Sequence, residues 1–237
     1  MSTLTSSPSN TKTNPGPTGR DSDASSSVSS PSTLICTPAE LHSFLRTRRS
    51  IRRFKTDPVP ESVIQTLLAT ATFAPSAHNR QPWRFVVITT QSVKESLATS
   101  MAADFERDLA RDGIPPEKIQ AQAKRSKERI VSAPVAILLC MDSSEMDVYS
   151  DENRQLAERT MAIQSVAAAG LQLLLAAHAE GLAGVWACWP LFAQETIQRT
   201  LSISKTWEPE AMFFIGYPDD SRQAREKKAI GEIALFL

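Results

Sequence analysis

Four arginines and one serine fall within six consecutive positions of the chain. They are Arg48, Arg49, Ser50, Arg52 and Arg53. Guanidinium groups bind phosphate oxygens bidentately, and a hydroxyl adds one further donor. The segment therefore predicts a phosphate site. Taken alone, the same pattern is also typical of a solvated basic surface or a nucleic-acid patch.

A second segment whose side chains could bind a ligand is the turn at residues 74–83, APSAHNRQPW, which precedes an apolar run. The Asn79 amide can match a donor and an acceptor on the edge of a planar ring, and asparagine also suits a tight turn. Ser76 would shape the loop or contact the ring, while His78 either faces a substrate or lies on the loop surface. With the arginines, this turn predicts the two ends of a flavin mononucleotide (FMN) site.

The elements that must position these residues form a mixed pattern of helices and strands. We expect helices at 37–47, 61–73, 93–111, 116–129 and 153–179, and strands at 83–88, 134–139, 185–189, 211–215 and 233–237. The helix at 153–179 is apolar enough to raise the question of a membrane span. Polar residues interrupt it, so we interpret it as a central core helix, covered in part by a second subunit. The terminal strand would join a sheet edge of this subunit or of a partner.

The bulk composition excludes several classes of protein. The net charge is +0, so neither nucleic acid nor a membrane surface is an expected partner. Three scattered cysteines and three histidines give no metal-ligand spacing and favour a reducing cytoplasm. Residues 1–36 are rich in Ser, Thr and Pro and should be a disordered tail, which leaves 37–237 as one domain.

The chain resembles the FMN-dependent nitroreductase family in four motifs that follow the family order. These are RRSIR at 48–52, PSAHNRQPW at 75–83, GLAG at 181–184, and a basic segment before the C-terminus. The resemblance implies an α+β fold with a mixed, mainly antiparallel sheet flanked by helices. It also implies a homodimer with the long helix at its interface, a C-terminal strand that can be exchanged between subunits, and FMN bound in clefts between the subunits.

The resemblance also assigns candidate cofactor-binding residues. They are Arg48, Arg49, Ser50, Arg52, Ser76, Asn79, Gly184, Val185, Trp186, Arg225 and Lys227. The arginines, Ser50 and Lys227 would hold the phosphate end, Asn79 the pyrimidine edge, and the backbone at 184–186 the flavin N5. No protein side chain is expected to act as catalytic acid or base, because the flavin carries the chemistry.

The implied activity is an FMN oxidoreductase that passes hydride through flavin N5 to an organic acceptor. A helical lid insertion at about 93–131 resembles the branch of the family that matures the deazaflavin cofactor. Lys124 and Arg125 on it are candidate contacts for an anionic deazaflavin precursor. NAD(P)H or a reduced deazaflavin would be the donor. Two alternatives stay open: a broad nitro-, quinone- or enone-reductase, and a flavin- or deazaflavin-binding protein without turnover.

Overall fold

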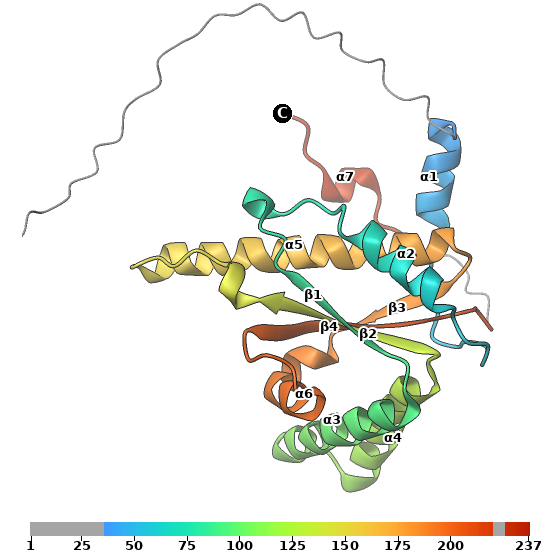
Figure 1. Ribbon diagram of the computed structural model, residues 1–237, viewed down its shortest axis with the longest axis vertical. Coiled ribbons are helices and arrows are strands. Elements are labelled where there is room, and N and C mark those ends of the chain that lie inside the picture. Colours follow the sequence, from blue (N-terminus) through green and yellow to red (C-terminus); the bar gives the residue numbers. More distant parts are fainter. Residues whose placement is uncertain (1–35, 220–225) are drawn as a thin grey trace, which may run out of the picture. The chain divides into compact units, whose positions relative to one another are not determined.

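The computed structural model of the chain describes residues 36–219 and 226–237. Four strands form an antiparallel sheet in the order β1-β2-β4-β3 (Figure 1). They are β1 (Trp83–Ile88), β2 (Val135–Asp142), β3 (Ala183–Ala187) and β4 (Trp207–Gly216). The central strand β2 is buried along its whole length, as a continuous apolar run predicts. The strand β3 lies at an edge of the sheet.

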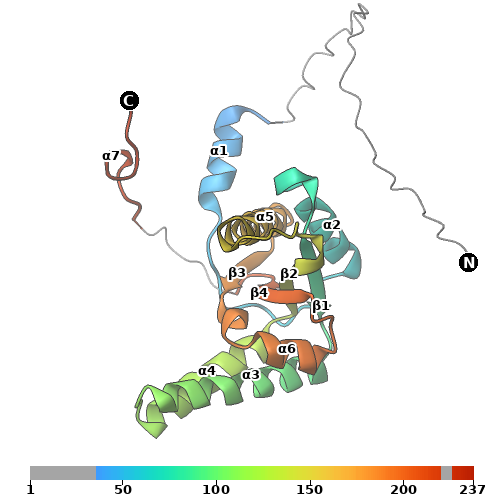
Figure 2. The same cartoon turned by 90° about the vertical axis from the view of Figure 1, so that its left-hand side faces the viewer.

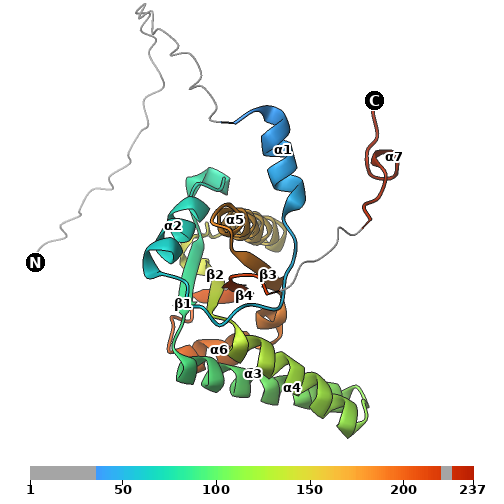
Figure 3. The ribbon, with the colours of Figure 1, turned by 90° about the vertical axis from the view of Figure 1, so that its right-hand side faces the viewer.

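Helices cover both faces of this sheet, and the side views show the resulting layers (Figures 2 and 3). One face carries α2 (Glu61–Ala71) and α5 (Glu152–Ala179), and the other carries α3 (Gln91–Arg111), α4 (Pro116–Ser132) and α6 (Gln194–Leu201). Alternate residues of β2 divide between two cores. Ile137 and Leu139 pack with α2 and α5, while Ala136 and Leu138 pack against the other layer. The predicted α+β fold is confirmed, with every strand pair antiparallel.

The long helix α5 is a core element of this fold. Its length and composition would be sufficient for a membrane span, yet half of its most apolar window is buried inside the protein. Asp151 caps its start by accepting a hydrogen bond from the Arg154 backbone N–H at 3.0 Å. The helix packs on α2 and on the sheet, in agreement with the interpretation as a central core helix.

The remaining helical segments are α1 (Pro38–Thr47), η1 (Ala77–Asn79), η2 (Ser143–Glu145), η3 (Trp189–Phe192) and α7 (Ile230–Ile233). The pair α3 and α4 corresponds to the predicted insertion at 93–131, and its connection contains Gly113 at φ 73°. The insertion is therefore helical as expected, while its role as a lid stays a prediction. Of the predicted tail at 1–36, residues 1–35 lie outside the described residues.

The elements differ from the expectations in three places. The strand expected at 233–237 does not join the sheet of this subunit, where α7 ends at Ile233 and Leu235 and Phe236 are exposed, while its exchange with a partner stays a prediction. Apolar composition predicts a strand only where a sheet edge accepts it, and the four-stranded sheet includes no pairing with this segment. The third strand covers 183–187 instead of 185–189, because η3 begins at Trp189. Helix α6 was not expected, since it is only 8 residues long and mostly polar.

Candidate functional site

The arginine segment crosses the ends of two strands. Ser50 forms an isolated parallel bridge with Gly184 of β3, and the Ile51 N–H donates to the Gly184 carbonyl at 3.3 Å. Further along, the Lys55 N–H donates to the Tyr217 carbonyl at 2.9 Å, just beyond β4. These bonds bring two of the predicted cofactor-binding segments, the arginines and residues 184–186, side by side.

Arg48 is half-buried, and its Nη1 is buried without a hydrogen-bond partner among the described residues. A buried guanidinium nitrogen without an acceptor is unfavourable, because the lost hydration is not replaced. An anion that bound here would supply the acceptor. This unsatisfied atom is the strongest local indication of a ligand in the arginine segment.

The neighbouring side chains contact the backbone of the same segment. Arg49 Nη1 donates to the Arg46 carbonyl and, at 2.9 Å, to the Arg48 carbonyl, so it satisfies carbonyls at and just beyond the end of α1. Arg52 Nη1 donates to the Ser50 carbonyl at 3.4 Å, and Ser50 itself is exposed. The roles of Arg49, Ser50 and Arg52 in holding a phosphate stay predictions.

His178, in the last turn of α5, lies against the arginine segment and was not predicted as a site residue. Its Nε2 is 3.0 Å from the Thr47 hydroxyl, and its ring stacks on Phe44 with centroids 4.8 Å apart. Burial and the positive charge of Arg48 lower the pKa of His178, and a hydrogen bond to the Phe44 backbone only partly offsets this. The neutral imidazole and the arginines therefore form an environment that favours an anion.

The loop that carries Asn79 has a strained backbone. His78, Asn79 and Gln81 have φ of 52°, 53° and 52°, the left-handed region that non-glycine residues rarely adopt. Each such residue costs about 1–3 kcal/mol, less for asparagine, and strain of this kind clusters at functional sites. Within the loop, the Gln81 N–H donates to Ser76 Oγ at 3.1 Å, and Gln81 Nε2 donates to Asn79 Oδ1 at 3.2 Å.

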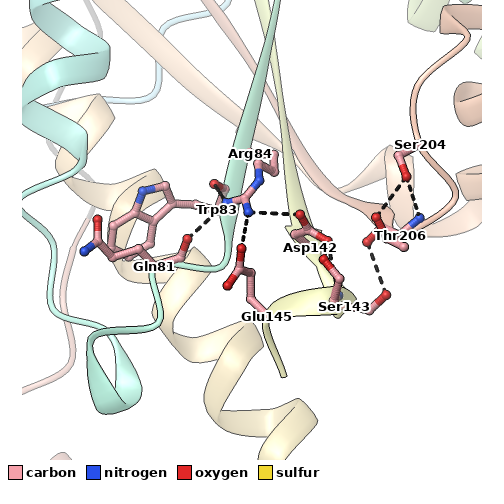
Figure 4. Close-up of polar contacts among 9 residues, drawn as sticks. Gln81, Trp83, Arg84, Asp142, Ser143, Glu145, Ser204 and Thr206 are labelled. Atoms are coloured by element: carbon pink, nitrogen blue, oxygen red, sulfur yellow. Dashed lines mark hydrogen bonds and ion pairs between the residues drawn. The ribbon is translucent and has the colours of Figure 1, made fainter. Parts of the chain in front are cut away.

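An ion-pair network fastens this loop to the sheet (Figure 4). Arg84 on β1 donates through Nη1 to the Gln81 carbonyl at 3.2 Å, and through Nη2 it pairs with Asp142 at 3.0 Å and with Glu145 at 2.6 Å. Burial raises the pKa of Asp142, but hydrogen bonds from Ser144 and the charge of Arg84 outweigh it and lower the pKa overall. Asp142 is therefore ionised at neutral pH. Through Arg84, the network holds the carbonyl of Gln81, a residue with positive φ, in place.

A single chain does not bring the Asn79 loop and the arginines together. The loop is fixed to the middle of α5, where the Ala77 N–H donates to Ser165 Oγ at 3.1 Å. Thr47, the residue before the arginine segment, contacts the end of the same helix at His178. At 1.5 Å per residue these two points of α5 are roughly 20 Å apart. Ser76 and Asn79 therefore lie far from the arginines of their own chain.

A cavity of about 200 Å³ adjoins the edge strand β3. Among the residues that line it are Arg52, Phe54, Arg129, Val185, Trp186 and Trp189. Val185 is buried and Trp186 half-buried, so the predicted segment serves both the core and the cavity wall. Gly184 permits the close packing behind this wall, because a Cβ there would lie 2.7 Å from Leu174 Cδ2. The volume is below the roughly 300–1,000 Å³ of a typical small-molecule site.

Several candidate residues are not brought to this region. Lys124 and Arg125 are exposed on α4, and neither lines the cavity beside β3. His78 is exposed on its loop, and Lys227 is exposed before α7. Arg225 lies outside the described residues. Within the described part of the chain, no group of His, Cys, Asp or Glu side chains could hold a metal ion.

The fold is an α+β arrangement with the arginine segment, a candidate anion site, at its sheet edge, and known proteins share this fold. The nitroreductase family matches residues 45–217. A 5,6-dimethylbenzimidazole synthase of Rhodospirillum rubrum is 30% identical over 196 residues, 81% of this chain and 88% of that protein. A Bacillus subtilis protein named as a candidate NAD(P)H nitroreductase is 26% identical over 190 residues, 80% and 90% of the two chains.

Among solved structures, a BluB-like flavoprotein of Clostridium difficile has a TM-score of 0.69 at 25% identity, covering 83% of this chain and 98% of that one. The chain therefore belongs to the nitroreductase family and is an oxidoreductase. These relatives support the family as a whole and not its deazaflavin-maturing branch in particular.

Proposed function

We propose that the protein is an FMN-dependent oxidoreductase that passes reducing equivalents from NAD(P)H to a small organic acceptor. The observation that carries the proposal is the bridge between Ser50 and Gly184, which sets the arginine segment beside the edge of β3. The unsatisfied Nη1 of Arg48 supports a bound anion at this place. Family membership supports the redox chemistry.

The residues present fit FMN. Arg48, Arg49, Ser50 and Arg52 would hold its phosphate through charge-assisted hydrogen bonds. The backbone at 184–186, on an edge strand, would offer donors to the ring. Bound FMN would supply hydride transfer, so the protein has to bind, orient and exclude water.

We propose further that the protein works as a homodimer in which each FMN contacts both subunits. The arginines of one subunit would bind the phosphate, and Ser76 and Asn79 of the partner subunit would contact the ring. Three observations support this: the points where the two segments meet α5 are roughly 20 Å apart, the cavity at β3 is small, and many apolar residues are exposed. The exposed apolar residues include Leu41, Leu45, Leu156, Leu171, Ile230, Ile233, Leu235, Phe236 and Leu237. The C-terminal segment would cover the partner, as an exchanged strand or otherwise.

A dehydro deazaflavin precursor is a second candidate acceptor, with a reduced deazaflavin as a possible alternative donor. The observation that favours it is the α3–α4 insertion, whose Arg129 reaches the cavity beside β3.

A cytoplasmic location is also proposed, because the three cysteines in the described residues are free thiols.

Anaerobic spectroscopy tests the proposal. NADH or NADPH should bleach the bound flavin, and a nitroaromatic, a quinone or a dehydro deazaflavin precursor should restore its colour. The acceptor that reoxidises it fastest identifies the reaction. A bound flavin that no such donor–acceptor pair reduces and reoxidises would instead identify a flavin-binding protein without turnover.

A further inference from the structure

The cavity beside β3 has two arginines from different parts of the chain. Arg52 comes from the arginine segment and Arg129 from the last turn of α4. Its other walls include the rings of Phe54, Trp186 and Trp189. No Asp or Glu is among the described residues that line it. The cavity therefore combines aromatic walls with two arginine side chains.

Arg129 is oriented by a ring and not by a carboxylate. Its guanidinium carbon lies 5.9 Å from the centroid of the Trp189 ring, a cation–π arrangement. Trp189 in turn packs against Phe214 with centroids 5.7 Å apart. None of the ion pairs found in the described residues involves Arg129. Its five donors are thus held near the cavity with no anionic partner from this part of the protein.

A helix terminus alone does not explain this placement. A cation in the last turn of α4 is favourable because it meets the negative end of the helix dipole. This interaction with the helix dipole would be equally favourable if the Arg129 side chain pointed away from the cavity. Its position over Trp189 and at the cavity is an additional feature, and it is absent from Lys124 and Arg125 on the same helix.

We propose that Arg129 is a specificity-determining residue that selects planar acceptors carrying a carboxylate or another anionic group. The acceptor ring would lie beside the bound FMN and against Trp189, and its anion would accept hydrogen bonds from Arg129, while Arg52 stays with the FMN phosphate. This inference rests on the proposed function, because it names the class of substrate for the same site.

The test compares two acceptors of equal shape, 4-nitrobenzoate and the neutral 4-nitrobenzamide, on the FMN-loaded protein. Arg129→Gln should raise KM about tenfold or more for the benzoate, the effect of losing a charge-assisted contact, and leave the benzamide unchanged. Arg129→Lys should recover only part of the loss, because it keeps the charge without the planar fork. Lys118→Gln removes an exposed cation from the same helix and should change neither KM.

A binding measurement without turnover gives an independent readout. Calorimetric titration of the protein with 4-nitrobenzoate should show the same loss of affinity in Arg129→Gln, which separates this inference from the proposed function. A wild-type protein whose flavin is never reduced would contradict the function, while the titration would still decide the role of Arg129.

Three results would overturn the inference. They are equal effects of Arg129→Gln on the benzoate and the benzamide, no effect on either, and an effect confined to NADPH relative to NADH. The last would assign the anion to the phosphate of the donor.

Discussion

Three side-chain polar atoms are buried without a hydrogen-bond partner among the described residues, and two of them mark places where a single charge affects the protein. Arg48 Nη1 is one, and the neighbouring His178 lowers the cost of that charge by staying neutral, since burial and Arg48 itself lower its pKa. Glu210 on β4 is the opposite case. Its Oε1 is buried without a partner among the described residues, and burial, only partly offset by Arg159, raises its pKa. A bound anion would stabilise the buried charge of Arg48, whereas the buried carboxylate of Glu210 is itself an unfavourable negative charge.

Glu210→Gln should stabilise the protein at neutral pH. The raised pKa means that the folded state holds the proton more tightly than the unfolded state, so the contribution of Glu210 to stability is lost as the pH rises above its ordinary pKa of 4.5. The substitution removes this loss. In thermal unfolding, Glu210→Gln should have a higher Tm than the wild type at pH 7. Its Tm should also differ less between pH 5 and pH 7 than that of the wild type.

Glu208→Gln is the matched control, because it removes a carboxylate of the same strand that pairs with Arg159 at 2.6 Å. It should be neutral or destabilising by up to about 1 kcal/mol. A Glu210→Gln protein that unfolds below the wild type at pH 7 would contradict this view of the strand.

At the scale of elements, the contact between α5 and β3 shapes the wall of the cavity. Gly170 of α5 lies against the Trp186 and Phe213 rings, which meet edge to face with centroids 5.0 Å apart. A Cβ at Gly170 would lie 2.8 Å from Phe213 Cζ and 2.8 Å from Trp186 Cζ3. Phe213 is fully buried, so Trp186 is the ring that can move. The helix thereby sets the position of a cavity residue.

Gly170→Ala should therefore destabilise the protein and disturb the cavity together. We expect a loss of about 1–3 kcal/mol in the free energy of unfolding, as for other overpacked cores, with a changed tryptophan emission and weaker FMN binding. Gly231→Ala is the control, because nothing lies within 4 Å of a Cβ at that position. If Gly170→Ala matched the wild type in stability and emission, α5 would not constrain Trp186.

The elements that could be predicted from sequence are those that contain a long apolar run. β2 is apolar along nearly all of its length and α5 along its second half, and such runs are buried as a central strand and as a core helix. Helix α6 was missed because its pattern is too short to show a period. The Arg84 network and the contact of His178 with Thr47 join residues far apart in sequence, and no local pattern reports such contacts.

At the scale of the whole molecule, the candidate site is divided along α5. The motifs at 48–52 and 75–83 were identifiable because each combines special residue types within a few positions. Their separation within one chain could not be predicted, since it follows from where each segment meets α5. The exposed apolar C-terminus and the small cavity agree with a site completed by a second copy.

Mixed dimers test this division. Arg48→Gln and Asn79→Asp should each weaken FMN binding about tenfold or more in homodimers, so that little FMN is retained on purification, and aspartate tolerates the backbone that Asn79 adopts. In a heterodimer of the two variants, one site would combine both defects and the other neither. FMN content should then return to about half of the wild-type value. A heterodimer without FMN would mean that each site uses both residues of one chain.

The measurement that tests the central claim most directly is FMN binding by the purified protein, with Arg48→Gln and Arg53→Gln beside it. The visible spectrum and the mass of the released chromophore should show FMN in the wild type. Arg48→Gln should weaken binding by about tenfold or more, because it removes a partly buried charge-assisted contact. Arg53→Gln, an exposed neighbour, should bind as the wild type does. A wild-type protein that is colourless and does not bind added FMN would contradict the account.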